Sequence, residues 1–504
     1  MDDDTRLTQA PTVNYNDDDN DDDDVIIAMM LMLLMLYFFQ ETNKQNGDGN
    51  NEDEALAEQL AMATLSRIRR DGEGDRQRRT RSKKTKFDYR RASNCVNHDY
   101  WGPNPLFSDC QFERFFRVTR AHADRILQVC ARADPFFTEK EDACQTATID
   151  PKVKILMALK CLAYGVSSTA FQDYFQMSES TGQKCIKKFT AAIAQDQELK
   201  ERYLRPLNRV DARRVVQHHL DQHGVAGMIG SLDCMHLVWR TCPMAWHGQF
   251  KGKEKYATIV LEALADNTLW IWHANFGAPG TLNDINIWDR SPLYESFING
   301  TFIEEVDFEF ELGGEMFSKL WALADGIYPD LERLAKPFSE PVGEDNIRYS
   351  AWQEAARKDI ERCFGVLQRK FAFLAKPIEL WFIEEISNTV YSCIIMHNMM
   401  VERRVEQGEQ EDAALYALHY TETPVVDTAL ETEERLDAEG NLRAALLQAN
   451  ALHDASLVYQ RHRLSSLRIR TVQRRWQDLH EADKHFRLQA AIRRQLAMNV
   501  AQGN

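Results

Sequence analysis

The sequence has no pair of cysteines at C-x-x-C spacing, although it contains ten cysteines among its 504 residues. They are scattered from Cys95 to Cys393. This scatter argues against a disulfide framework and against a structural zinc site, and it favours a reducing compartment. The hydrophobic content of 44% and the ten tryptophans are typical of a globular protein with room for two or three domains.

The sequence also lacks an apolar run long enough to cross a membrane. The longest, Val25–Phe39, has fifteen residues. As a helix it would span roughly 22 Å, short of the roughly 30 Å of hydrocarbon in a bilayer. The acidic run Asp21–Asp24 precedes it, where a signal peptide needs basic residues. We therefore expect no membrane role and favour a local helix that docks on the protein or on a partner.

A net charge of −16 is unusual for a DNA-binding protein, but the charge is divided into blocks along the chain. Residues 1–66 are strongly acidic, 67–91 basic, 402–440 acidic and 441–504 basic. The middle of the chain is only mildly acidic, and a cluster of metal-binding carboxylates would explain part of that.

These shifts predict four regions. Residues 1–91 form an acidic arm and basic linker, largely disordered, and 92–206 form a helical domain. Residues 207–402 form a mixed α/β domain, and 403–504 form a polar linker and a basic C-terminal helix. The basic stretch Arg67–Arg91 is either a nuclear import signal, an arm that grasps phosphates, or a solvated linker.

The helical domain has the layout of a helix–turn–helix motif. Helical patterns cover Pro151–Tyr164, Thr169–Phe175 and Glu179–Ala194, with Ser178 as the expected N-cap of the last helix. That helix carries three lysines that suit insertion into a major groove, namely Lys184, Lys187 and Lys188. Plain packing of short helices is the alternative explanation.

From about residue 228 the pattern changes to a mixed α/β arrangement. Apolar runs at 228–239, 256–266 and 269–277 predict three adjacent antiparallel strands. A helix over 281–294, a hairpin around Gly313-Gly314 and a further strand follow.

Two helices complete the expected elements. A long amphipathic helix over 351–374 has one apolar stripe: Trp352, Ala356, Ile360, Cys363, Leu367, Phe371 and Leu374. A basic amphipathic helix is expected over 465–497, and its three alternative roles are dimerisation, DNA contact or plain exposure to solvent.

Two aspartates stand out by their positions in strands. Asp233 lies inside an apolar strand, where a carboxylate without a partner would cost several kcal/mol, so a metal ion or another partner is expected. Exposure on an edge strand is the alternative. Asp325 follows a strand and precedes Gly326, which fits a functional strand end or an ordinary Asp-Gly turn.

Two further acids belong to helices. Asp284 lies three residues after Thr281, so it is either a metal ligand or the third residue of a capping box. Glu361 flanks the apolar stripe with Arg357 and Gly365 one turn away on either side. A glycine in mid-helix suggests a close approach there, whereas a surface Glu–Arg pair is the alternative.

Together the four acids suit the cleavage of phosphodiester bonds by two metal ions. Such chemistry needs hard oxygen ligands around a pair of cations roughly 4 Å apart. Basic residues on the same long helix would then contact the DNA backbone: Arg357, Lys358, Arg362, Arg369 and Lys370.

Several motifs resemble the PIF/Harbinger superfamily of DDE transposases, in the form common in plants and oomycetes. They are GSLDCMH (230–236), GAPGTLNDINIWDRSPLYE (277–295), WALADGIYP (321–329), EAARKDIERCFGVLQRKF (354–371) and MHNMMVE (396–402). The resemblance covers about residues 110–402 and implies an RNase H-like catalytic domain. By motif, the catalytic acids fall on Asp233, Asp325 and Glu361, and a fourth metal-binding acid falls on Asp284.

The resemblance also implies an activity and partners. These are excision and insertion of an element with terminal inverted repeats, a divalent cation (Mg²⁺ or Mn²⁺), double-stranded DNA with short AT-rich targets, and nuclear localisation. A Myb-like accessory protein and a homo-oligomer are further expectations. The alternative is a domesticated DNA-binding regulator that keeps the nuclease fold without transposing. The basic linker and the helix–turn–helix pattern argue against a hydrolase that acts on something other than DNA.

Overall fold

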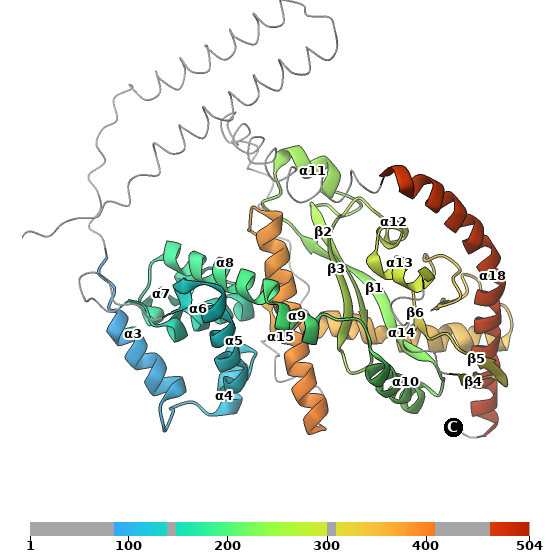
Figure 1. Ribbon diagram of the computed structural model, residues 1–504, viewed down its shortest axis with the longest axis horizontal. Coiled ribbons are helices and arrows are strands. Elements are labelled where there is room, and N and C mark those ends of the chain that lie inside the picture. Colours follow the sequence, from blue (N-terminus) through green and yellow to red (C-terminus); the bar gives the residue numbers. More distant parts are fainter. Residues whose placement is uncertain (1–84, 139–147, 300–308, 409–463, 503–504) are drawn as a thin grey trace, which may run out of the picture. The chain divides into compact units, whose positions relative to one another are not determined.

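A computed structural model describes residues 85–138, 148–299, 309–408 and 464–502 (Figure 1). The described residues from Lys86 onward form one compact unit. The apolar run Val25–Phe39 and most of the basic linker lie outside the described residues. Within the described part, no helix is both long enough and apolar enough to span a membrane.

The first part of the unit contains helices and no strand among its described residues, and a separate helix–turn–helix domain stays a prediction. Its helices are α3 Tyr89–Val96, α4 Asp109–Phe116, α5 Arg120–Ala133, α6 Pro151–Tyr164, α7 Gln172–Phe175, α8 Glu179–Gln195, α9 Gln197–Tyr203 and α10 Arg209–His223. Short π- and 3₁₀-helical turns lie at Asn97–Trp101, Pro135–Phe137 and Ser168–Phe171. Ser178 caps α8 as predicted, since its side chain accepts a hydrogen bond from the amide of Thr181.

The lysines of α8 are not all available for DNA. Lys187 pairs with Glu385 at 2.5 Å, and Lys188 pairs with Asp134. Lys184 is exposed and lies over the ring of Phe136. α8 itself packs against α5, α6 and α15 (Ile383–Gln407), so much of its surface serves helix packing.

The second part contains a five-stranded mixed sheet in the order β3-β2-β1-β6-β7. Its strands are β1 Met228–Val238, β2 Thr258–Ala265, β3 Ile271–Pro279, β6 Trp321–Leu323 and β7 Leu334–Ala335. The first three pair antiparallel as predicted, whereas β6 and β7 run parallel to β1. This α/β arrangement is compatible with an RNase H-like fold.

A separate two-stranded sheet joins β4 Phe310–Leu312 to β5 Glu315–Phe317. Gly313 and Gly314 form its turn with φ of 60° and 79°. Positive φ at both central positions is what a tight hairpin turn requires, so the predicted hairpin is confirmed.

Helices flank the sheet, namely α11 Met244–Phe250, α12 Asp284–Trp288, α13 Pro292–Asn299, α14 Glu344–Lys370, α15 and α18 Leu464–Ala501, with a 3₁₀ turn at Ala372–Leu374. α14 packs on β1, β2 and β6, while α15 packs on β3 (Figure 1). The predicted stripe of α14 is confirmed, because Ile360, Cys363 and Leu367 are fully buried. The helix begins seven residues earlier than expected, at Glu344.

Two expectations about helices are wrong in detail. The segment 281–294 is not one helix: α12 ends at Trp288, and Pro292 starts α13 because proline suits a first helical turn. For the C-terminal helix, solvation is wrong for its last turns, which pack on the rest of the unit and bury Leu488 and Ile492 (α18, red in Figure 1). Dimerisation and DNA contact by this helix stay predictions.

Candidate active site

Asp233 lies on β1, the central strand of the sheet, so the alternative of an edge-strand position is wrong. Its side chain is 20% exposed. One carboxylate oxygen accepts a hydrogen bond from the amide of Cys234 at 2.9 Å, and the other accepts one from Arg357 at 2.8 Å. The predicted need for a partner is therefore met, and in this structure that partner is a guanidinium.

Burial raises the pKa of Asp233, and the nearby charges of Asp284 and Asp325 raise it further. The amide of Cys234 and the charge of Arg357 act in the opposite direction. Three predicted acids are thus close enough to repel one another, an arrangement that a cation would relieve.

Asp325 reaches this cluster through the pairing of parallel strands. Ser231 of β1 is paired with Leu323 of β6. Extending that register by two residues places Asp325, just beyond β6, beside Asp233. One oxygen of Asp325 accepts a hydrogen bond from the amide of Gly326 at 2.7 Å, so the predicted Asp-Gly turn is present together with the strand-end position.

Asp284 is the first residue of α12, and the predicted capping box is wrong. Asn283 is the N-cap, with its side chain accepting from the amide of Asn286. The hydroxyl of Thr281 instead donates to the carbonyl of Gln249 at 2.6 Å. Asparagine is a stronger N-cap than threonine, which explains the shift by two residues. The carboxylate of Asp284 therefore does not cap the helix.

The surroundings of Asp284 join it to the same cluster. Burial raises its pKa, and the charge of Asp325 raises it further, while His236, Cys234 and Lys253 lower it. Cys234 and His236 belong to the same short motif as Asp233, GSLDCMH, which is the signal in the sequence that could identify them as neighbours of the carboxylates.

Glu361 is connected to Asp233 through Arg357, which pairs with both carboxylates. The two side chains are one turn apart on α14, with a guanidinium nitrogen of Arg357 3.2 Å from a carboxylate oxygen of Glu361. Glu361 is 52% exposed, whereas Arg357 is only 18% exposed and also binds Asp233. The predicted Glu–Arg pair exists, but it is one half of a bridge between α14 and β1.

Arg357 was predicted to contact the DNA backbone, but it is paired with Asp233 and Glu361. Lys370 was predicted to contact DNA as well, and it also differs from that expectation. Lys370 is fully buried, because it follows Cys363 and Leu367 at helical spacing on the apolar stripe. Arg362 pairs with Asp359 at 3.2 Å, while Lys358 and Arg369 are exposed.

The close approach expected at Gly365 is absent from the described residues. A Cβ built there would meet no atom within 4 Å. The glycine therefore faces open space, one turn beyond Glu361.

The carboxylates fit divalent metal ions by their chemistry. Asp233, Asp284 and Asp325 offer hard oxygen ligands from three different segments of the chain, and burial raises the pKa of Asp233 and of Asp284. Among the described residues, no three of the four acids offer oxygens all within 4.8 Å of one another. A spread set of this kind suits two cations better than one, since paired ions about 4 Å apart need ligands on both sides.

Comparison with known proteins gives a consistent result. The family described as plant transposon protein matches residues 201–408. The chain is 22% identical over 265 residues to "Putative nuclease HARBI1" of Bos taurus, covering 52% of this chain and 70% of that protein. It is 21% identical over 318 residues to "Protein ALP1-like" of Arabidopsis thaliana, covering 61% and 74%.

No solved structure matches the chain significantly. The matched segment contains all four acids together with β1, β6 and α14. Residues 201–408 thus match the plant transposon protein family, and the relatives named above are consistent with the Harbinger-derived transposase family.

Proposed function

We propose that this protein is a metal-dependent DNA endonuclease and transposase, which cuts phosphodiester bonds at the ends of an element and joins the 3′-hydroxyl to target DNA. The observation that carries the proposal is the convergence of Asp233 in the middle of β1, Asp325 just beyond β6 and Asp284 at the start of α12. Arg357 ties α14 to Asp233. The naming of two relatives as nucleases supports it.

Asp233, Asp284 and Asp325 would hold Mg²⁺ or Mn²⁺, with Glu361 as the fourth ligand. Bound ions supply a nucleophilic water or 3′-hydroxyl and neutralise the leaving oxygen. The protein contributes fixed carboxylates on rigid elements, because β1 and β6 set the spacing of Asp233 and Asp325. Glu361 is half exposed and paired only with Arg357 among the contacts of the described residues, so it has freedom to turn toward the cluster.

Arg357 takes a specific part in this scheme. Its guanidinium lies between Asp233 and Glu361 and neutralises charge that a metal ion would otherwise neutralise. We infer that Arg357 holds the two carboxylates in place while no cation is bound, and gives up at least one of them on metal binding.

The substrate in this proposal is double-stranded DNA with terminal inverted repeats, reached in the nucleus, with a Myb-like protein as an accessory. Exposed Lys358 and Arg369 on α14 are available for backbone phosphates. The alternative, a domesticated regulator that binds DNA through α8, is less favoured because Lys187 and Lys188 have partners within the protein.

The test is cleavage of a duplex that carries the inverted repeats flanking the gene, with purified full-length protein in Mg²⁺ and in EDTA. We expect cleavage only with the metal, and its loss in Asp233→Ala and Glu361→Gln. Glu354→Gln is a matched control, since this exposed acid lies two turns before Glu361 on the same helix. Equal cleavage by the wild type and by Asp233→Ala in Mg²⁺ would show that the assignment is wrong. Absence of flanking repeats, with DNA binding retained, would favour the regulator.

A further inference from the structure

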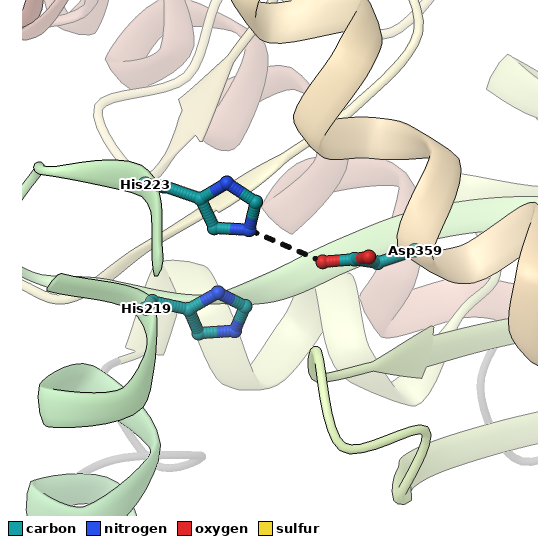
Figure 2. A group of neighbouring side chains, drawn as sticks. All are labelled: His219, His223 and Asp359. Carbon is teal, nitrogen blue, oxygen red and sulfur yellow. Dashed lines mark hydrogen bonds and ion pairs between the residues drawn. The ribbon is translucent and has the colours of Figure 1, made fainter. Parts of the chain in front are cut away.

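Two histidines of α10 and an aspartate of α14 form a second group of metal-ligating side chains. His219 and His223 are one helical turn apart, and Asp359 reaches them from the neighbouring helix (Figure 2). One ligand atom from each lies within 4.8 Å of the others. Across the described residues, no other group of three histidine, cysteine or acidic side chains meets this condition.

His219 is buried without hydrogen-bond partners for its ring, which needs an explanation. It is 0% exposed, and neither of its ring nitrogens has a hydrogen-bond partner. Its ring stacks on that of His223 at a centroid distance of 5.5 Å. Leaving a buried polar atom without a partner costs about 1–3 kcal/mol, so a ligand for one of these nitrogens is expected.

Burial and, to a lesser extent, the neighbouring His223 lower the pKa of His219 to about 3, while the charge of Asp359 acts in the opposite direction. The imidazole is therefore neutral at physiological pH, the form that binds metal ions.

His223 and Asp359 are already oriented toward one another. The Nε2 atom of His223 lies 3.2 Å from one carboxylate oxygen of Asp359, and both side chains are largely buried. The other oxygen pairs with Arg362 at 3.2 Å. Arg362 is itself fixed by donating a hydrogen bond to the carbonyl of Asn267. Outer contacts of this kind orient the ligands of metal sites.

We propose that His219, His223 and Asp359 bind a structural transition-metal ion of the Zn²⁺ class. Two imidazoles and a carboxylate are a common donor set for zinc, whereas Mg²⁺ prefers oxygen ligands alone. Ligand atoms about 2.1 Å from zinc in a tetrahedron lie about 3.4 Å apart, so the side chains need to close by little more than about 1 Å. Water completes the coordination.

This site is distinct from the proposed catalytic carboxylates and does not depend on their function. At about 100° per residue, Asp359 lies about 160–200° around α14 from Arg357 and Glu361. The two sites therefore flank the apolar stripe of the helix on opposite sides. A metal ion here would fasten α10, which leads into β1, to the helix that carries Glu361.

The absence of paired cysteines predicted no structural zinc site, and the proposed site needs none. The signal in the sequence is the pair of histidines at i and i+4 in HHLDQH (218–223), which places two imidazoles on one face of a helix. Asp359 lies 136 residues from His223, so only the fold brings the three ligands together.

Zinc content and affinity test the proposal directly. Untagged full-length protein is stripped with a chelator and titrated with Zn²⁺ in excess Mg²⁺, which occupies the carboxylates. We expect one zinc ion per chain. Loss of an outer-shell partner of a metal site typically costs about 10–100-fold in affinity, so removing a direct ligand in His219→Ala or Asp359→Asn should cost at least that. His218→Ala, a half-buried neighbour on the same helix, should bind zinc like the wild type. A wild type that binds no zinc under these conditions overturns the proposal.

A second variant separates metal binding from simple packing and also guards against misfolding. His219→Leu replaces two unpartnered nitrogens with an apolar side chain and should raise the melting temperature of the chelated protein. Zn²⁺ should raise the melting temperature of the wild type and leave that of His219→Leu unchanged. If zinc stabilises both proteins equally, His219 is not a ligand and the proposed site is wrong.

Discussion

Replacing Arg357 by alanine should destabilise the protein much more without metal than with it. In the metal-free protein, Asp233 would keep only the amide of Cys234 as a partner. Removing one member of a buried ion pair costs about 3–5 kcal/mol. Both side chains are about one-fifth exposed, so solvent screening reduces the expected cost to about 2–3 kcal/mol.

Mg²⁺ should remove most of this cost, because the cation takes over the neutralisation of Asp233. What is left is the loss of the hydrogen bonds of Arg357, about 1 kcal/mol. The difference between the two conditions, about 1–2 kcal/mol, corresponds by linkage to roughly tenfold tighter Mg²⁺ binding by Arg357→Ala.

Urea unfolding in EDTA and in saturating Mg²⁺ measures the first effect, and a Mg²⁺ titration measures the second. Arg348→Ala is the control on the same helix. Arg348 pairs with Glu344 and Asp345, which are 87% and 70% exposed, so about 0.5 kcal/mol is expected in both conditions. If Arg357→Ala loses the same free energy with and without Mg²⁺, the cation does not compete with Arg357 for Asp233, and the reasoning fails.

Three further predictions follow from particular side chains. Folding raises the pKa of Asp233 and Asp284, so above about pH 3.9 the folded protein holds protons that the unfolded chain has released. The free energy of unfolding in EDTA should therefore fall as the pH rises from about 3.9 through the raised pKa values. Urea unfolding of Asp284→Asn should show a weaker fall, and the same dependence of stability on pH as in the wild type would refute this. Lys358→Ala should reduce the slope of log affinity against log salt for DNA by about one, whereas Lys370→Met should leave it unchanged, and an equal effect of both would contradict the burial of Lys370. Ile492→Ala in α18 should cost about 2–4 kcal/mol in urea unfolding, and a cost below about 0.5 kcal/mol would mean that the helix does not pack on the unit in solution.

The strands and the placement of two acids could be predicted because they depend on short-range patterns. Alternating and continuous apolar runs locate β1 to β3 to within a few residues. The position of Asp325 at a strand end follows from the apolar run before it, and parallel pairing with β1 then brings it to Asp233. The pairing itself was not predictable from the runs, since no local signal states which strand is the neighbour of β1.

Other features depend on competition between groups that the sequence does not rank. Asn283 caps α12 in preference to Thr281, whose hydroxyl finds the carbonyl of a distant residue, Gln249. Arg357 binds across to β1 as well as along its own helix, and only the fold brings Asp233 within reach. Lys370 is different, because its spacing from Leu367 places it on the apolar stripe, and this position rather than its charge decides that it is buried.

The three sides of α14 explain why its rotational setting matters to both sites. One side packs on the sheet through Ile360 and its neighbours, one carries Arg357 and Glu361, and one carries Asp359. Rotation of the helix about its axis would therefore move Glu361 and Asp359 together. The distance between Asp233 and Asp325, by contrast, is set by the register of β1 and β6 and does not depend on α14. It follows that loosening the contact of Asp359 with α10 should disturb the position of Glu361 relative to the aspartates while leaving the aspartate pair intact.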